Sequence, residues 1–434
     1  MGLVSGTCGR EQGATTKRIG YLVLALLAAT GGSATAEPAP ADTGHPTVVL
    51  MLFDGFAAAT RALYATAELD RLRSEGAWSH QLAAAFPTVS LVNGITVSTG
   101  CWPQRHGIVG NRFIDPQRGM YDHSRDPDWL FSCEHIHQVV ERQGLRAAAL
   151  GWYGSRSATR DRQVGREDVE YDCTDPRDLE RSAEILKLLE EPASDRPDLI
   201  VAYFCGPDEP QHFEGIDSDA TRDAVAEADR IVGRIRRRIA SLPDAHDVTL
   251  MVVTDHGMTP VSRLINLTRI LRRVGVSGRV VSNDGTAYVY LEDPGRAPTA
   301  RRLLGGYAEF DAFTRDQPPE FAHLGDSQRV GDLVLVARPP SFFADPALWP
   351  WYTRWLAWIG PDSYDVGGRL RADHGYPPDH PDMYGIFYAW GAGVTPGINL
   401  GRIEAIDIHP TIARLLHVSP GKPIDGTPLG LSVQ

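Results

Sequence analysis

The stretch Thr47–Gly55, with the sequence TVVLMLFDG, decides the fold class of this chain. Its first part is uncharged and rich in Val and Leu, which is typical of a strand buried on both faces. The run ends in Asp54-Gly55, where a strand gives way to a turn. Buried strands of this kind form largely parallel sheets, and functional groups gather at their carboxyl ends. Asp54 is therefore the first candidate site residue.

Similar apolar runs recur along the chain, and helical patterns separate several of them. The strand-like runs cover residues 147–150, 199–204, 249–254 and 385–389. Helical patterns are expected at residues 60–75, 179–189 and 221–239. This alternation predicts an α/β fold with a largely parallel central sheet and helices on both of its faces.

The regular alternation weakens between Gly257 and Arg371. Short strand-like runs remain at residues 288–291 and 333–337, and the segment Trp349–Trp358 (WPWYTRWLAW) is rich in tryptophan. We interpret about residues 280–370 as a smaller inserted subdomain or cap. The expected catalytic domain spans residues 47–420, and residues 421–434 form a C-terminal tail. We expect the tryptophans to form a packed sub-core, with a substrate platform as the alternative.

The N-terminus is typical of a secretory signal peptide, expected at residues 1–36 and followed by a linker at 37–46. Lys17 and Arg18 precede the apolar run Ile19–Ala29, and Ala34-Thr35-Ala36 offers a small-x-small cleavage site. The apolar run is too short for a stable membrane span. A periplasmic or secreted protein is expected, with an uncleaved N-terminal anchor as the alternative.

The net charge indicates which partners are expected, and the cysteines indicate which covalent links are expected. A net charge of −12 argues against binding to nucleic-acid polymers or anionic membranes, but not against a small phosphate ester at a metal site. Four cysteines follow the signal: Cys101, Cys133, Cys173 and Cys205. In an oxidising compartment they predict one or two disulfides, and three pairings are open. No CxxC pair occurs, so a thiolate zinc site is not expected.

Several Asp and His residues stand where the chain breaks beside Gly or Pro. The metal-ligand candidates are Asp54, Asp208, His212, Asp255, His256 and His374. Carboxylates and imidazoles are ligands that Zn²⁺ accepts. Taken singly, a strand-end Asp can also cap a helix, and Asp373 and His380 compete with His374. Their agreement in type and place predicts a site for two metal ions and metal-assisted phosphoryl transfer.

Asp208 and His212 lie four residues apart. On a helix that spacing would place both side chains on one face. Pro207 and Pro210 favour a tight loop instead, and a loop can also turn both side chains inward. A solvated acidic turn is the alternative interpretation.

The segment Phe86–Gly94 carries the candidate nucleophile. Its Pro near the start and Gly near the end predict a helix. Two hydroxyls compete there: Thr88 is expected as the N-cap, which leaves Ser90 in the first turn as the nucleophile. A phosphate is attracted to a helix N-terminus, and a bound metal would lower the pKa of the hydroxyl.

Two further polar motifs need an interpretation. Asn111 ends another strand-like run, and its amide N–H₂ could donate to a phosphate oxygen as negative charge builds there; an ordinary turn Asn is the alternative. The run Cys101-Trp102-Pro103-Gln104-Arg105 looks like a sulfatase motif. It follows the expected nucleophile helix and does not begin it, so we regard it as a coincidence.

Together these residues resemble the nucleotide pyrophosphatase/phosphodiesterase family of the alkaline phosphatase superfamily, from about Thr47 to Leu416. The family segment Phe-Pro-Thr-x-Thr-x-x-Asn is similar to Phe86–Asn93, and its catalytic threonine falls on Ser90. The other matching motifs are Phe53-Asp54-Gly55, Trp102–Asn111, Asp208 with His212, Asp255–Met258 and His374-Gly375-Tyr376.

The resemblance implies an alkaline-phosphatase-like fold and two zinc ions. It assigns one ion to Asp208, His212 and His374, and the other to Asp54, Asp255 and His256, with Ser90 between them. It also implies that the Ser90 alkoxide attacks phosphorus in line. Asn111 would stabilise the developing charge, and the phospho-serine would then be hydrolysed.

Two departures from the family concern the substrate. Serine replaces the usual threonine, which should preserve the chemistry. Leu91 stands where nucleotide-hydrolysing members carry a phenylalanine that stacks on the base, whereas Tyr203 matches the other stacking residue. Loss of one aromatic wall could cost about 1–3 kcal/mol of base binding.

The expected substrate is therefore a small phosphodiester, with nucleotides as one candidate class. The alternatives within the superfamily are a phosphomonoester, a phosphonate or a phospholipid headgroup. A catalytically silent binding protein is a third hypothesis, and the complete set of ligand candidates argues against it.

Overall fold

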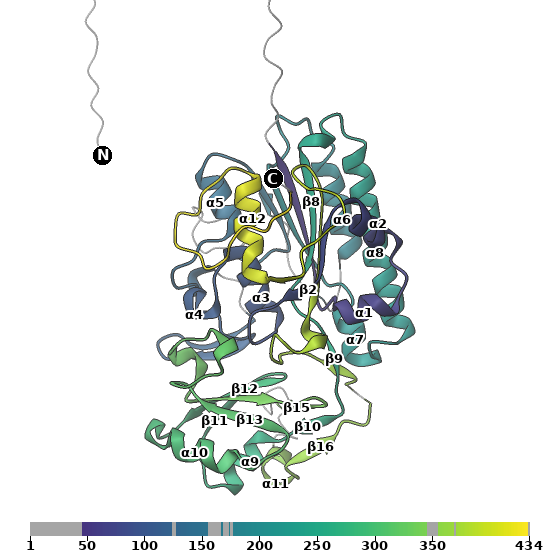
Figure 1. The fold of residues 1–434 in the computed structure, drawn as a ribbon. Helices are drawn as coiled ribbons and strands as arrows, with labels where there is room; N and C mark the ends of the chain where they lie inside the picture. Colours follow the sequence, from purple (N-terminus) through teal and green to yellow (C-terminus); the bar gives the residue numbers. More distant parts are fainter. Residues whose placement is uncertain are drawn as a thin grey trace, which may run out of the picture. The chain divides into compact units, whose positions relative to one another are not determined.

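Strand β1 (Thr47–Phe53) lies inside the main sheet, as its uncharged sequence predicts (Figure 1). It pairs in parallel with β7 (Leu199–Phe204) on one side and with β8 (Val248–Thr254) on the other. The strand order is β19-β2-β18-β8-β1-β7-β5-β6, and β20 also pairs with β2. Strand β18 (Gly385–Gly391) runs antiparallel to both β8 and β2. The prediction of a largely parallel sheet is confirmed.

The main sheet contains five further strands. They are β2 (Ala77–Ala83), β5 (Ala147–Leu150), β6 (Arg166–Glu167), β19 (Ile398–Asn399) and β20 (Arg402–Glu404). The computed structural model describes residues 46–123, 127–154, 166–167, 173, 177–344, 355–368 and 370–432. The expected signal peptide, most of the linker and the first part of the tryptophan segment lie outside the described residues. No helix in the described ranges is long and apolar enough to cross a membrane.

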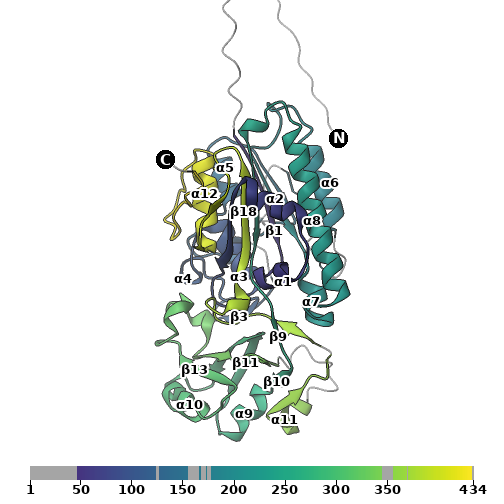
Figure 2. The same cartoon turned by 45° about the vertical axis from the view of Figure 1, so that its right-hand side comes forward.

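Helices cover both faces of the sheet, as predicted (Figure 2). Alternate side chains of β1 enter two separate cores, with Leu50 in one and Met51 in the other. One face packs against α3 (Ser90–Thr99), α5 (Ile136–Arg142) and α12 (Ile408–Leu415). The other packs against α2 (Ala67–Glu75), α6 (Asp178–Leu188) and α8 (Asp219–Ala240).

A smaller group of elements has a core of its own. It contains the antiparallel sheet β11-β12-β14-β13 and the three-stranded sheet β15-β10-β16. The chain leaves the main unit after β9 (Thr259–Pro260) and returns at β17 (Ala372–Asp373), and these two strands pair with each other (Figure 1). The chain therefore leaves the main unit and re-enters it at the same place.

The elements of this group are short. The strands are β10 (Arg263–Ile265), β11 (Gly278–Asn283), β12 (Thr286–Leu291), β13 (Phe310–Thr314), β14 (Leu333–Ala337), β15 (Ser341–Phe343) and β16 (Ser363–Asp365). The helices are α9 (Leu267–Arg273), α10 (Ala297–Leu304) and α11 (Leu356–Ile359). Trp355 and Trp358 are more than half exposed, so a packed sub-core is wrong for these two tryptophans.

The helix expected at residues 60–75 is interrupted. It forms α1 (Ala58–Leu63) and α2, with Tyr64 extended between them. The Tyr64 hydroxyl donates to the carbonyl oxygens of Ile216 and Ser218. The carboxylate of Asp229, on α8, accepts from the N–H groups of Glu68 and Leu69 in the first turn of α2, which lack partners inside the helix. Contacts with distant parts of the chain therefore set this break.

A group of buried histidines lies behind α3 and predicts sensitivity to acid. Burial lowers the pKa of His106 and His137 to about 3 and that of His409 to about 4, and it lowers the pKa of His135 well below 6.5. The unfolded chain takes up protons below about pH 6.5, whereas the folded chain does not, so stability should fall as pH decreases from there. Each of these histidines should lower the free energy of unfolding by up to about 1.4 kcal/mol for each pH unit below that point.

Urea unfolding at pH 7.5 and pH 5 measures this effect. We expect a His137→Leu variant to lose less unfolding free energy than the wild type between the two pH values. The exposed His246 provides the control, because a His246→Leu variant should keep the wild-type dependence. An equal pH dependence in all three proteins would contradict the prediction for His137.

Candidate active site

The carboxyl ends of β1, β7 and β8 bring the predicted acidic residues together. Asp54 and Asp255 directly follow β1 and β8, and Asp208 opens α7 (Asp208–Glu214), shortly after β7. The Gly55 N–H donates to Asp255 Oδ1 over 3.1 Å, which ties the two strand ends together. The Asp208 side chain lies against Gly55, where even an added Cβ would meet Asp208 Oδ1 at 2.5 Å. Gly55, at φ +63°, is needed for this approach.

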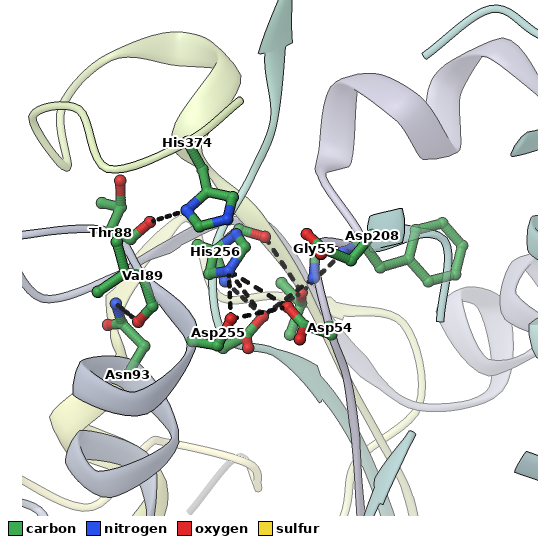
Figure 3. A network of polar contacts seen from close by, with 12 residues as sticks. Asp54, Gly55, Thr88, Val89, Asn93, Asp208, Asp255, His256 and His374 are labelled. Carbon is green, nitrogen blue, oxygen red and sulfur yellow. Dashed lines mark hydrogen bonds and ion pairs between the residues drawn. The ribbon is translucent and has the colours of Figure 1, made fainter. Parts of the chain in front are cut away.

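The predicted helix at the nucleophile segment is present and begins at Ser90, as α3. Asn93 fixes the loop before it, because its side chain bonds to Ala85 and to the carbonyl oxygen of Val89 (Figure 3). The expected N-cap role of Thr88 is wrong. Val89 is the N-cap residue, and the Thr88 hydroxyl donates to the Tyr376 carbonyl oxygen. A contact with a distant segment has replaced the local cap.

Ser90 points toward the acidic cluster. Its Oγ lies 3.1 Å from His256 Nε2 and 3.3 Å from Asp54 Oδ1. His256 Nε2 in turn lies 3.2 Å from Asp54 Oδ1. A hydroxyl at the first position of a helix, beside a carboxylate and an imidazole, is well placed to act as a nucleophile.

The three candidate histidine ligands are oriented in the same way. Each uses Nδ1 to bond a backbone carbonyl oxygen: His212 bonds Ala372 at 2.9 Å, His256 bonds Gly257 at 2.9 Å, and His374 bonds Thr88 at 3.1 Å. Figure 3 shows the bond of His374. With Nδ1–H as the donor, Nε2 is the ring atom that can bind a metal ion once it carries no proton. Metal-binding histidines are commonly oriented by such bonds.

The charges in the cluster are strongly coupled. Burial, together with the neighbouring Asp54 carboxylate, raises the pKa of Asp255 well above its usual value. Burial alone would lower the pKa of His256, but Asp255 and Asp54 raise it to about 10. Burial also acts to raise the pKa of Asp54, yet the bond and charge of His256 and the bond from Tyr203 lower it overall. The cluster therefore attracts positive charge.

Two buried carboxylate oxygens in the cluster have no hydrogen-bond partner within the described ranges of the chain. They are Asp208 Oδ1 and Asp255 Oδ2. Leaving a buried anionic oxygen without a partner is costly unless a cation pairs with it. Together with the Nε2 atoms of the three histidines, these oxygens fit divalent zinc, whose ligands are imidazole nitrogen and carboxylate oxygen.

Among the described residues, three groups of side chains have donor atoms close enough to hold an ion. They are Asp208 with His212 and His374, Asp54 with Asp208 and His256, and Asp284 with Asp373 and His374. The first is the set that the resemblance implies. The second contains Asp208 in place of Asp255. In the third, Asp284 lies 4.0 Å from His374 Nδ1, the atom that bonds Thr88, so this group is less suitable. His380 belongs to none of these groups; it caps a 3₁₀ turn.

The loop expected around Asp208 and His212 is a helix. Pro210 occupies the third position of α7, where its missing N–H would have had no partner inside the helix. Asp208 and His212 therefore share one face, with His212 Nε2 3.4 Å from Asp208 Oδ2.

Of the other predicted site residues, Asn111 and Leu91 line the catalytic cavity, whereas Tyr203 is buried beneath it. Asn111 and Leu91 line a cavity of about 480 Å³ together with Ser90. Asn111 Oδ1 accepts the Leu91 N–H over 2.9 Å, which leaves its N–H₂ as a donor. Tyr203 is fully buried, and its hydroxyl bonds to Asp54. Its contact with a base stays a prediction that this burial does not support.

The cysteines form two disulfides, Cys101–Cys133 and Cys173–Cys205. Cys101 is therefore no free thiol, and Arg105 binds Asp425, which agrees with the interpretation of the sulfatase-like run as a coincidence.

The sequence did not predict four residues that line the catalytic cavity: His123, Glu209, Phe213 and Asp284. The one available signal was that Glu209 and Phe213 each follow a ligand candidate on what proved to be a helix.

The chain was compared with known proteins. The family model described as type I phosphodiesterase/nucleotide pyrophosphatase matches residues 48–377. An uncharacterized pyrophosphatase/phosphodiesterase from Schizosaccharomyces pombe is 25% identical over 407 residues, covering 88% of this chain and 79% of that protein. Human ectonucleotide pyrophosphatase/phosphodiesterase family member 1 is 24% identical over 418 residues, covering 89% and 42%. A venom phosphodiesterase from Crotalus durissus collilineatus is 25% identical, covering 91% and 47%.

The chain thus spans about half the length of the venom and human relatives. Among solved structures, an inactive form of murine ectonucleotide pyrophosphatase/phosphodiesterase 5 in complex with AMP has a TM-score of 0.75 at 22% identity. The match covers 88% of this chain and 97% of the murine chain, and it shows a shared fold. Since the family model matches most of the chain, this protein belongs to the type I phosphodiesterase/nucleotide pyrophosphatase family.

Proposed function

We propose that this protein is an exported two-zinc phosphodiesterase/pyrophosphatase that hydrolyses nucleotide or related small phosphodiesters through Ser90. One observation carries the proposal: Ser90 Oγ lies at the start of α3 and within 3.3 Å of both Asp54 and His256. Asp208, His212 and His374 would hold one zinc ion, and Asp54, Asp255 and His256 the other. Bound zinc would lower the pKa of the Ser90 hydroxyl and neutralise the charge of the phosphate.

The reaction proceeds in two displacements at phosphorus. Ser90 Oγ forms a bond to phosphorus while the bond to one ester oxygen breaks, and the departing group leaves as an alcohol after taking up a proton. Water then adds to phosphorus, the bond to Ser90 breaks, and Ser90 regains a proton. The products are a phosphomonoester and an alcohol, so overall one water is consumed.

Asn111 and the start of α3 act on the phosphate during both steps. The Asn111 N–H₂ donates to a non-bridging oxygen, where negative charge builds in the transition state. Its Oδ1 is held by the Leu91 N–H, which fixes the direction of the amide. The dipole of α3 favours negative charge at the same end of the helix.

Export is supported by two observations. The N-terminal sequence has the charged, apolar and small-residue pattern of a signal peptide. The two disulfides are typical of an oxidising compartment such as the periplasm or the extracellular space.

Initial rates on three chromogenic esters test the reaction type. Purified zinc-loaded protein is assayed with bis-p-nitrophenyl phosphate, thymidine 5′-monophosphate p-nitrophenyl ester and p-nitrophenyl phosphate. We expect both diesters to be hydrolysed faster than the monoester. A preference for p-nitrophenyl phosphate would overturn the diesterase assignment and favour a phosphomonoesterase.

A Leu91→Phe variant tests the nucleotide preference. Leu91 lines the catalytic cavity, and a phenyl ring there could stack on a base. Stacking contributes about 1–3 kcal/mol, so kcat/KM for the thymidine ester should rise by roughly tenfold relative to bis-p-nitrophenyl phosphate. A Leu91→Met variant is the control for side-chain size without a ring. An unchanged ratio in the Phe variant would remove nucleotides from the preferred substrates.

A further inference from the structure

An exposed apolar patch lies at and beside α11. Trp355, Trp358 and Ile359 are 57%, 59% and 64% exposed, the three largest exposed fractions of any large apolar side chain among the described residues. All three fall within five positions of the chain. Single apolar side chains are normal on a protein surface, whereas a cluster of them marks an interaction site. We call these three residues the α11 patch.

The α11 patch takes no part in the catalytic site. The described lining of the catalytic cavity contains no residue of α9 or α11, so a substrate bound at Ser90 does not account for the exposed side chains. Figures 1 and 2 both show α9, α10 and α11 at the end of the smaller group of elements that faces away from the main sheet. The patch is therefore accessible to a partner that approaches this end.

Arginines of α9 border the α11 patch. The guanidinium groups of Arg269 and Arg272 donate to the Trp358 carbonyl oxygen over 3.4 and 3.5 Å, and Arg272 lies 5.8 Å from the Trp358 ring centroid. Neither of these two arginines forms an ion pair within the described part of the chain, whereas Arg273 pairs with Asp362. Positive charge therefore remains at the border of the patch.

The local charge differs in sign from the charge of the whole chain. Residues 263–304, which include α9 and α10, contain eight arginines and three acidic residues, whereas the net charge of the chain is −12. At an ionic strength of about 0.15 M, exposed charges more than about 8 Å apart are largely screened from each other. The arginines beside the patch, and not the distant acidic residues, therefore decide what the patch attracts at contact.

We propose that the α11 patch binds the surface of a phospholipid bilayer that contains anionic lipid. Tryptophan is enriched where a protein meets the headgroup region, because its ring is apolar and its N–H can keep a polar partner. The apolar side chains enter the boundary between headgroups and acyl chains, and Arg269 and Arg272 lie among the anionic headgroups. A stable protein interface buries roughly 800 Å² on each partner, which is more than three side chains provide.

Sedimentation with vesicles measures this binding directly. Purified protein is mixed with sucrose-loaded vesicles of phosphatidylcholine alone, or of two parts phosphatidylcholine to one part phosphatidylglycerol. We expect the partition coefficient to be at least about tenfold larger for the vesicles that contain phosphatidylglycerol. Raising the salt to about 1 M should remove most of this preference, because the Debye length then falls to about 3 Å.

Variants separate the apolar contribution from the charged one. Trp358→Ser and the double variant Arg269→Gln/Arg272→Gln should each lower the partition coefficient at least about tenfold. The matched controls are Leu179→Ser, at a side chain 52% exposed on α6, and Arg234→Gln, at an exposed position on α8. Both controls should bind vesicles like the wild type. An unchanged urea midpoint shows that each variant is folded.

The outcomes decide between a bilayer and other partners. Partitioning that is equal in Trp358→Ser and the wild type, or absent with both kinds of vesicle, would overturn the proposal. Self-association that Trp358→Ser abolishes, without vesicle binding, would assign the patch to a contact between two copies of the chain and would also overturn it. Partitioning requires no turnover, so its result is independent of the proposed phosphodiesterase function.

Discussion

Replacing Ser90 by alanine is expected to lower kcat for bis-p-nitrophenyl phosphate by at least about 10³-fold, because it removes the hydroxyl proposed to form the bond to phosphorus. Ser90 Oγ is the hydroxyl that lies against both His256 and Asp54. Thr88, the nearest competitor in sequence, donates its hydroxyl to Tyr376 and accepts the Gly375 N–H. The structural role of Thr88 leaves it unavailable for attack.

Ser90→Thr is the matched variant for this experiment. It keeps a hydroxyl at the first position of α3 and restores the residue that the resembling family uses. We expect its kcat to stay within about tenfold of wild type. Stopping the wild-type reaction with acid and analysing the peptides by mass spectrometry should detect a p-nitrophenyl phosphoryl group on Ser90, because only one of the two ester groups has left at that stage. A Ser90→Ala protein that hydrolyses the diester at the wild-type rate would refute the assignment.

Removing His374 should reduce the zinc content from about two ions to about one ion per chain and abolish most activity. His374 is 4% exposed, and its Nδ1 is committed to the Thr88 carbonyl oxygen, which aims Nε2 at Asp208 and His212. Elemental analysis after dialysis against a weak chelator measures the zinc directly. Substituting Asp255 by Asn should cause a similar loss from the zinc site proposed for Asp54, Asp255 and His256, because the Asp255 Oδ2 atom that lacks a hydrogen-bond partner within the described residues would no longer carry a charge.

The matched control is His380→Ala. His380 lies nearby in the sequence and was the competing candidate, but it caps a 3₁₀ turn and belongs to none of the three groups. We expect this variant to keep its zinc. Full zinc content in His374→Ala would refute His374 as a zinc ligand. A loss of zinc from His380→Ala would instead favour His380 as the ligand.

The sequence by itself determined the strands and the side chains at their ends. A buried strand must be apolar throughout, so TVVLMLF and the equivalent runs at β7 and β8 were visible without tertiary information. Asp54 and Asp255 follow directly because parallel strands present their carboxyl ends at one edge of the sheet. The helix that begins at Ser90 was visible from its Pro and Gly.

Only the tertiary structure decided how those side chains are used. Asp229 and Tyr64 divide the first expected helix through contacts across more than 150 residues, as between Tyr64 and Ile216. The same applies to the Thr88 hydroxyl, which bonds Tyr376 and caps no helix. A local pattern cannot record such partners, because the free energy of a hydrogen bond depends on which group is present in the folded chain.

The orientation of the histidines and the helical form of α7 also depend on contacts that the local sequence does not reveal. Each candidate histidine ligand takes its direction from a carbonyl oxygen, and for His374 that oxygen lies on Thr88, 286 residues away. Pro207 and Pro210 favoured a loop, whereas packing of α7 against α8 and β17 stabilises a helix. That helix places Phe213 and Glu209 beside the reaction centre. Residue types thus gave the chemistry, and long-range packing gave the geometry, since burial and partner contacts exist only once the chain has folded.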